Sequence, residues 1–307
     1  MTPIVIHFSQ PLSATAVHEL TVSPSVPGTW TLQTATTLRF VPTGAFAPYS
    51  KVTVTTRPGL TSDAGAHLHR RLRFSFSVGA PSTGRLTQLL AMQGYLPLSF
   101  QPAQSRQRTV AADRAALFAP PAGRLVWDSG WPAALHVVWA HSPSVVIRGA
   151  VMAFESAHNM TMDGVVGPAV WTALEQAQEK RQRSPVAYSY AIASESSPES
   201  LTVWHAGHQV LHTLANTGIP VAPTALGTYP VYERLQNQVM QGTNPDGSHY
   251  ADPVSWVAYF NGGDAVHYFP RASFGYPQSL GCVELPYAQA QTAWGYLTYG
   301  TLVTVAA

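Results

Sequence analysis

Short runs of alternating apolar and polar residues fill the first part of the chain. They are IVIHF, TWTLQ, TLRFVP, KVTVTT and LRFSFSV, all before residue 80. Turn-forming clusters such as PSVPG, PTGAFAP and SDAGAH separate them. A period of two residues, broken by turns at this spacing, is typical of strands in a small sandwich. The pattern therefore predicts a β-sandwich over residues 1–79.

The apolar spacing becomes helical between residues 80 and 183. LTQLLAMQGYLPL begins as a short helix, and a second helix carries the apolar residues Val151, Phe154 and Ala157 on one face. Gly167-Pro168 then places a proline at the first position of a third helix. A stretch rich in Arg, Pro, Ala and Trp, residues 99–145, interrupts this pattern. We predict a mainly helical domain with an insertion.

Strand patterns return after the RQRSP linker, so residues 184–307 are predicted to form a third, mostly β domain. Alternating runs surround an Ala206-Gly207 turn, and SWVAYFNGGDAVHYF forms a hairpin with Gly262-Gly263 at its tip. Pro286 is placed to open a helix through about Tyr299, and TLVTV ends the chain as a strand.

Composition narrows the function classes. Only 10% of the residues are charged and the net charge is +2, with no basic stripe between aromatic residues, so nucleic acid is not an expected partner. No apolar run reaches the length of a membrane span. The chain starts inside an apparent strand, and we expect a signal peptide or anchor to precede it. The histidines of WHAGHQVLH lie on a strand, a turn and a strand, so no metal site is expected.

The candidate chemistry lies in HYFPRASFGYPQSLGCVEL, which contains the only cysteine, Cys282, downstream of His267. A thiol beside an imidazole is the minimum for covalent acyl transfer. A single cysteine is more often a small apolar residue in a core than a nucleophile, so the residues around Cys282 must distinguish the two. Gly281 leaves backbone amides open to a ligand, and the predicted helix at Pro286 begins close enough to favour a thiolate.

The third domain resembles the L,D-transpeptidase catalytic domain of the YkuD type. The resemblance rests on NTG at 216–218, PTALGTYPV at 223–231, NGGDAVH at 261–267, Gly275 and SLGCV at 279–283. It implies that Cys282 is the nucleophile and His267 the base, and that Ser279 and Gly281 shape the loop. The residues expected to contact substrate are Arg271, Tyr268, Gly275, Leu280 and Glu284. No metal or cofactor is implied.

Two positions depart from the family pattern. Leu280 stands where the family usually has a second histidine, and Glu284 where it usually has Asn or Arg. A carboxylate near the thiol would raise the thiol pKa unless Arg271 offsets it.

The resemblance implies a secreted, wall-associated bacterial enzyme that acts on peptidoglycan stem peptides. The thiol would attack a diamino-acid carbonyl, release D-Ala and pass the acyl group to a second stem-peptide amine as a 3→3 cross-link. Alternatives are an L,D-carboxypeptidase, if water replaces the amine, and a wall-binding scaffold with impaired catalysis. A papain-like peptidase fits less well, because its cysteine precedes its histidine. A monomer is expected.

The two upstream segments have weaker resemblances. Residues 1–79 resemble a bacterial immunoglobulin-like module. Residues 80–183 resemble a peptidoglycan-binding three-helix module, which would make glycan a further partner. The predicted fold is thus multidomain: a β-sandwich, a helical module and a mostly β catalytic domain of the L,D-transpeptidase type.

Overall fold

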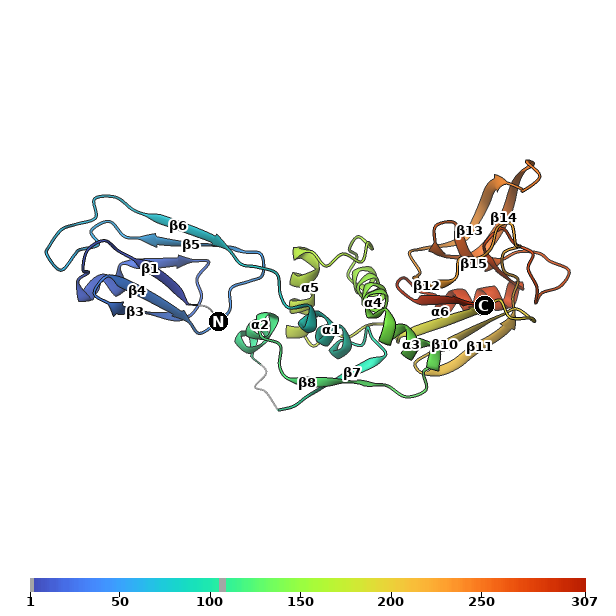
Figure 1. Cartoon of the computed structure of the whole chain (residues 1–307), viewed down its shortest axis with the longest axis horizontal. Coiled ribbons are helices and arrows are strands. Elements are labelled where there is room, and N and C mark those ends of the chain that lie inside the picture. The colour runs from blue at the N-terminus through green and yellow to red at the C-terminus, as the bar shows by residue number, and fades with distance from the viewer. Residues whose placement is uncertain (1–2, 105–108) are drawn as a thin grey trace. The chain divides into compact units, whose positions relative to one another are not determined.

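The computed structural model describes residues 3–104 and 109–307 (Figure 1). The chain divides into two compact units. The first combines residues 1–89, 102–124 and 167–181, and the second combines residues 90–101, 125–166 and 182–307. The division into three domains at residues 79 and 183 stays a prediction.

The strands expected before residue 80 are present and form two three-stranded antiparallel sheets, ordered β1-β4-β3 and β2-β5-β6. Leu38 on β4 and Val54 on β5 share one core, so side chains from both sheets pack together. The immunoglobulin-like sandwich itself stays a prediction. The strand bounds are β1 Ile4–His7, β2 Leu20–Ser23, β3 Gly28–Thr34, β4 Thr37–Pro42, β5 Lys51–Thr56 and β6 Arg73–Ser77, with a 3-10 helix at Ala14–His18.

Helices occupy much of the region between residues 80 and 183, as the apolar spacing predicts. The helix that begins at Pro168 has this proline in its first turn, where a missing N–H costs nothing. A two-stranded sheet interrupts the helices. The bounds are α1 Thr83–Met92, β7 Leu98–Pro102, α2 Val110–Phe118, β8 Gly123–Trp127, α3 Ala133–His141, α4 Pro143–Ala157 and α5 Pro168–Glu179.

The remaining residues of the second unit form two sheets around one helix. A five-stranded sheet has the order β11-β10-β9-β17-β12, and a four-stranded sheet has the order β13-β14-β15-β16. The pairs β9–β17 and β15–β16 are parallel. The bounds are β9 Ser189–Ser194, β10 Ser200–His205, β11 His208–Leu214, β12 Gly227–Pro230, β13 Glu233–Thr243, β14 His249–Asn261, β15 Asp264–Tyr268, β16 Val283–Leu285, α6 Tyr287–Tyr296 and β17 Leu302–Ala306.

Helix α6 lies between the two sheets (Figure 1). Its buried residues Ala290 and Ala293 join one core with Val203 of β10 and Val266 of β15. The helix is shorter than predicted: Pro286 is its N-cap and it ends at Tyr296 rather than near Tyr299. The small side chains on its buried face let both sheets approach closely.

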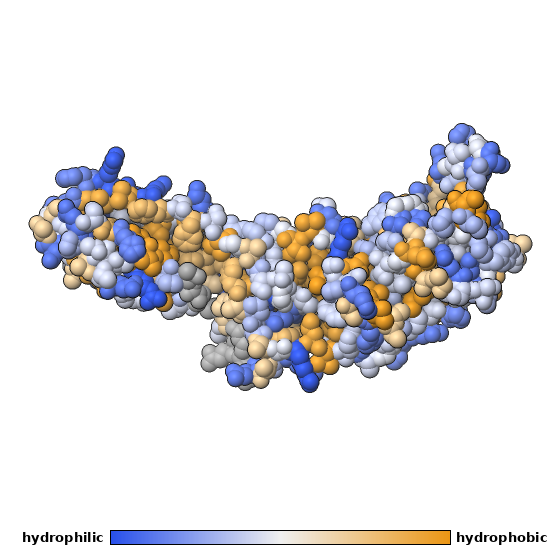
Figure 2. Space-filling view, in the orientation of Figure 1, coloured by the Kyte–Doolittle hydropathy of each residue, from blue (hydrophilic) through white to orange (hydrophobic). Residues whose placement is uncertain are grey.

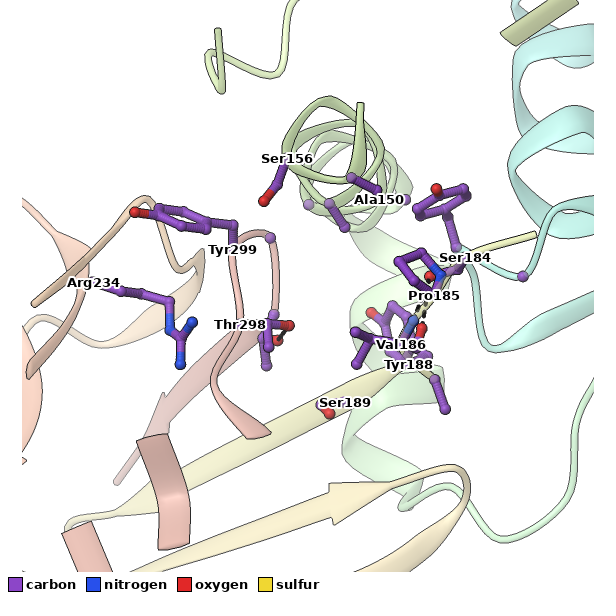
Figure 3. A pocket seen from close by; sticks show the side chains of 18 residues that line it. Ala150, Ser156, Ser184, Pro185, Val186, Tyr188, Ser189, Arg234, Thr298 and Tyr299 are labelled. Atoms are coloured by element: carbon purple, nitrogen blue, oxygen red, sulfur yellow. Dashed lines mark hydrogen bonds between the residues drawn. The ribbon is translucent and has the colours of Figure 1, made fainter. Parts of the chain in front are cut away.

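Helix α4 packs against the end of the five-stranded sheet. A cavity of about 250 Å³ lies beside this contact. Figure 3 shows Ala150 and Ser156 of α4 at one side of it, Arg234 and Tyr299 at another, and Ser184 opposite these two. None of the residues expected to carry chemistry lines this cavity.

The β13–β14 hairpin extends beyond the rest of its unit (Figure 1). Its turn is closed by Gly247, which donates from its backbone N–H to Asn244 O, and by Asp246, whose carboxylate accepts from Ser248. Figure 2 colours this tip white and blue, so the projecting end is polar. The inner part of the hairpin is available to form the wall of a site.

Within residues 3–104 and 109–307, no single helix has the length and apolar character needed to cross a membrane. Helices α3 and α4, taken together as a bent pair, reach that length and apolar character, on length and composition alone.

We expect Gly149→Ala to destabilise the protein by about 1–3 kcal/mol, since overpacking a tight contact forces backbone shifts. A Cβ at Gly149 would lie 2.5 Å from Gly300 O and 2.9 Å from Leu302 Cδ2. Gly295 on α6 is the matched control, because its Cβ would meet nothing within 4 Å. Gly295→Ala should be neutral or stabilising by up to about 1 kcal/mol. Urea unfolding of both variants checks this, and equal effects would contradict it.

Candidate active site

Two of the predicted catalytic residues lie at a pair of neighbouring parallel strands: His267 is on β15, and Cys282 comes directly before β16. His267 on β15 is opposite Glu284 on β16, and Val266 is opposite Val283. Alternation along a strand places every second residue on the same face. Val266 and Val283 join the core around α6. His267, Glu284 and Cys282, which immediately precedes β16, therefore face the other side of the sheet.

Backbone hydrogen bonds hold the loop that ends in Cys282. Asn216 and Glu284 exchange both backbone N–H···O bonds, at 3.0 and 2.9 Å. The carbonyl of Thr217 accepts from the amides of Gln278 and Ser279, and Ile219 donates back to Ser279 O at 2.9 Å. The NTG stretch noted in the sequence is thus the segment against which the loop is aligned.

A buried carboxylate fixes that segment in turn. Glu199 is 2% exposed and accepts from the Thr217 amide at 2.6 Å and from the Thr217 hydroxyl at 2.8 Å. The side chain of Asn216, itself fully buried, accepts from the Gly275 amide at 3.0 Å. Hydrogen bonds that satisfy buried polar groups make the loop position costly to change.

Cys282 is partly exposed to the cavity, but its sulfur lies deep. The thiol donates to Gly263 O with an Sγ–O distance of 3.7 Å. Burial, with smaller contributions from the carboxylates of Asp264 and Glu284, raises the pKa of Cys282 to about 12, although a hydrogen bond from the Ala265 amide opposes the shift. The thiol is therefore protonated at neutral pH.

His267 is 3% exposed and its Nδ1 donates to Tyr268 O at 2.9 Å. This bond selects the tautomer that leaves Nε2 as an acceptor. Burial lowers the pKa of His267, with a smaller lowering from Arg271; the bond to Tyr268 and the charge of Glu284 oppose the shift. The imidazole is neutral at neutral pH, which suits a general base.

Ser279 and Gly281 shape the turn before the thiol. The Ser279 hydroxyl donates to Cys282 O at 2.6 Å, and the Gly281 amide donates to Ser279 Oγ at 3.2 Å. Gly281 has φ +115°, and a Cβ there would lie 2.5 Å from Asp264 Oδ1. Only glycine fits this position without strain.

Arg271 and Glu284 form a two-pronged ion pair. Arg271 Nε and Nη2 each lie 2.8 Å from a carboxylate oxygen, and Nη2 also donates to Gln278 O at 3.0 Å. The guanidinium lies over the ring of Phe269, 4.7 Å from its centroid. Hydrogen bonding to Glu284 raises the pKa of Arg271. Glu284, which departs from the family pattern, is therefore paired with Arg271, yet its charge still contributes to the raised pKa of Cys282.

These residues line one cavity of about 650 Å³. Of the predicted site residues, it contains Cys282, His267, Ser279, Leu280, Glu284 and Arg271. Three others do not line it: Gly281 lies in the turn before Cys282, and Tyr268 and Gly275 lie elsewhere. Tyr268 faces the α6 side, where it packs edge-on against Tyr287, and Gly275 pairs through its backbone with Ala215 and Glu199.

The cavity also contains residues that sequence reasoning did not single out for chemistry. Asp264 sits at the start of β15, and Tyr250, Asp252 and Tyr259 come from β14. Asp264 had one available signal, because it lies within the NGGDAVH stretch. The β14 residues had none, since only the pairing of the hairpin brings them to the thiol.

The raised pKa of Cys282 predicts the pH profile of its alkylation. Because the thiolate reacts, the rate with iodoacetamide should rise about tenfold per pH unit from about pH 7 to pH 10 without a plateau. An ordinary cysteine levels off above about pH 9. Stopped-flow or mass-spectrometric rates check this, with Cys282→Ala as the unlabelled control. A plateau below pH 9 would refute the assignment of a disfavoured thiolate.

Removing the arginine of the ion pair should destabilise the domain. Arg271→Met leaves the Glu284 carboxylate, 6% exposed, without its cation, at a cost of about 3–5 kcal/mol. Arg271→Met combined with Glu284→Leu should cost less than Arg271→Met alone, since no buried charge remains. Urea unfolding midpoints of the variants test this. A single-variant cost below about 1 kcal/mol would show that the pair behaves as a surface one.

Comparison with known proteins identifies the domain. Residues 189–305 match the model of the L,D-transpeptidase catalytic domain family, YkuD. No curated protein sequence matches the chain. An L,D-transpeptidase structure from Mycobacterium smegmatis is 14% identical with a TM-score of 0.36, covering 100% of this chain and 91% of that one.

Two further structures are similar. L,D-transpeptidase 3 from Mycobacterium tuberculosis, with a faropenem-derived adduct, is 15% identical with a TM-score of 0.36, covering 99% of this chain and 91% of that one. The catalytic domain of the E. faecium L,D-transpeptidase is 24% identical with a TM-score of 0.35, covering 38% of this chain and 95% of that one. From the family match, residues 189–305 are an L,D-transpeptidase catalytic domain of the YkuD family.

Proposed function

We propose that the protein is a cell-wall L,D-transpeptidase that forms 3→3 peptidoglycan cross-links through a thioester on Cys282. The observation that carries the proposal is the placement of Cys282 and His267 on one face of the β15–β16 pair, in one cavity, within a domain of this family. Thiol, base and cavity are the components that acyl transfer from an amide requires.

In the first half-reaction, His267 Nε2 takes the thiol proton as Sγ attacks the carbonyl on the L-centre of the donor diamino acid. A C–S bond forms, and the electron pair of the carbonyl moves to its oxygen. The Cys282 amide lies next to this oxyanion as a donor, and the long bond from the Gly281 amide to Ser279 can yield to it. The C–N bond then breaks, and His267 returns its proton to the departing D-Ala amine.

In the second half-reaction, an amine of another stem peptide attacks the thioester carbonyl. His267 accepts the amine proton, a C–N bond forms, the C–S bond breaks, and the thiol is reprotonated. Both half-reactions begin from a neutral thiol and a neutral imidazole, because burial disfavours the charged form of each. His267 therefore acts as a general base during the attack, and Cys282 is a neutral thiol in the resting site.

Two alternatives rest on specific features. Water in place of the amine makes the protein an L,D-carboxypeptidase, since nothing in the first half-reaction differs. A wall-bound protein with impaired catalysis is favoured by the pKa of about 12 at Cys282. Either role keeps peptidoglycan as the partner and places the protein outside the cell at the wall. Glycan binding by residues 80–183 belongs to the same proposal.

Acylation by a carbapenem tests the nucleophile. Wild-type protein should gain one adduct in intact-mass measurements, and Cys282→Ala should gain none. His267→Gln, which removes the base while keeping a polar side chain, should slow acylation about 100-fold or more. Wild-type protein without an adduct would support the impaired-scaffold role. An undiminished adduct on Cys282→Ala would place the reaction elsewhere.

Muropeptide analysis then distinguishes the products. Incubation with disaccharide-tetrapeptide should yield a 3→3 cross-linked dimer and free D-Ala from wild-type protein. Tripeptide without dimer would identify the carboxypeptidase. Cys282→Ala is the matched control for any contaminating activity.

A further inference from the structure

The cavity around Cys282 has more negative than positive charge. Asp252, Asp264 and Glu284 contribute carboxylates, and Arg271 is the only arginine or lysine among its lining residues. Arg271 is already bonded to both oxygens of Glu284. Across the described ranges 3–104 and 109–307, no ion pair is formed by Asp252 or Asp264. Two carboxylates therefore face the space where substrate enters.

Asp264 lies beside the turn that leads to the nucleophile. It opens β15, and its Oδ1 lies 2.5 Å from where a Cβ on Gly281 would be, directly beside the residue that precedes Cys282. Its Oδ2 receives only long bonds, from the Ala225 amide at 3.3 Å and from Asn261 Nδ2 at 3.5 Å. The carboxylate retains capacity for a stronger partner.

The chemistry of the second half-reaction supplies such a partner. The acyl acceptor is a primary amine, which is mostly an ammonium at neutral pH and must reach the carbonyl held on Cys282. A carboxylate beside the acylated sulfur attracts that cation and offers no comparable attraction to a neutral nucleophile. Leu280, at the position of the family's usual second histidine, adds no charge that would compete.

We infer that Asp264 binds the ammonium group of the acyl acceptor and so determines that an amine, rather than a neutral nucleophile, is taken up beside Cys282. The inference rests on the proposed transpeptidase function and adds a specificity-determining residue to it. The acceptor's ammonium would replace the weak bonds to Asn261 and Ala225 as the principal partner of the carboxylate. Loss of one proton from the ammonium to solvent frees the amine for attack, and neutral His267 then accepts the second proton as the C–N bond forms.

Asp264 also acts on the free thiol before acylation. Its charge is one of the influences that raise the pKa of Cys282, so removing the charge should favour the first half-reaction. Asp252 is not among those influences; its charge instead raises the pKa of Arg271. The two aspartates of the cavity are therefore distinguishable by experiment.

Asp264→Asn is the informative variant, with Asp252→Asn as the matched control. Asp264→Asn should raise the KM for a tetrapeptide acceptor about tenfold, while capture of the thioester by hydroxylamine, a neutral nucleophile, changes by less than about twofold. Acylation by a carbapenem should become faster, because a negative charge beside the thiol is gone. Asp252→Asn should change the acceptor KM by less than about threefold.

A loss shared by both nucleophiles and by acylation would overturn the inference in favour of a purely structural aspartate. Equal changes in the acceptor KM for Asp252→Asn and Asp264→Asn would also overturn it, because the effect would then come from the overall negative charge of the cavity and not from Asp264.

Binding of the tetrapeptide to Cys282→Ala, by calorimetry, separates this inference from the proposed function. About tenfold weaker binding when Asp264→Asn is added supports Asp264 whether or not wild-type protein reacts. Unchanged binding overturns it even if wild-type protein cross-links normally.

Discussion

The pairing of Asn216 with Glu284 is the constraint on which the site depends. These two residues bond through both backbone groups, and each also carries a side chain that the site needs. The Asn216 side chain holds Gly275, and the Glu284 side chain holds Arg271. Asn216 follows β11 of the five-stranded sheet, and Glu284 lies on β16, directly after Cys282. Their antiparallel bridge therefore connects the two sheets next to the thiol.

This connection explains how a long loop can place a nucleophile reproducibly. The loop between β15 and β16 must cross from one parallel strand to the start of the next, and such crossings are usually made by helices. Here the crossing loop is held by backbone hydrogen bonds to Thr217 and Ile219 and not by a helix. The Glu199 carboxylate accepts from the amide and the hydroxyl of Thr217, which would otherwise be buried without partners. These hydrogen bonds fix the position of the loop backbone.

Much of this site was accessible from the sequence. The resemblance to the YkuD family named His267, Ser279, Gly281 and Cys282, and their catalytic roles stay a prediction. The structure brings His267, Ser279 and Cys282 to one cavity. Tyr268 and Gly275 were expected to contact substrate, but the structure places neither in the cavity. Tyr268 alternates with His267 and faces the opposite side, and Gly275 serves the anchoring of the loop.

What the sequence did not reveal depends on pairing between distant segments. The strands before residue 80 and the helix at Pro168 follow from local patterns, whereas Asp252 and Tyr250 reach the cavity only because β14 pairs with β15. The Arg271–Glu284 pair was foreseen as a possible offset of charge, but its two-pronged geometry required the register of β16.

The close approach of Gly149 and Gly300 has a consequence for dividing the chain. A Cβ at Gly149 would lie 2.5 Å from Gly300 O and 2.9 Å from Leu302 Cδ2, so the backbone of helix α4 lies directly against the turn before β17. A fragment that starts at residue 184 would expose that surface, including the Leu302 side chain, to water. The second compact unit includes the helix at Pro143–Ala157, which sequence patterns assign to the preceding domain.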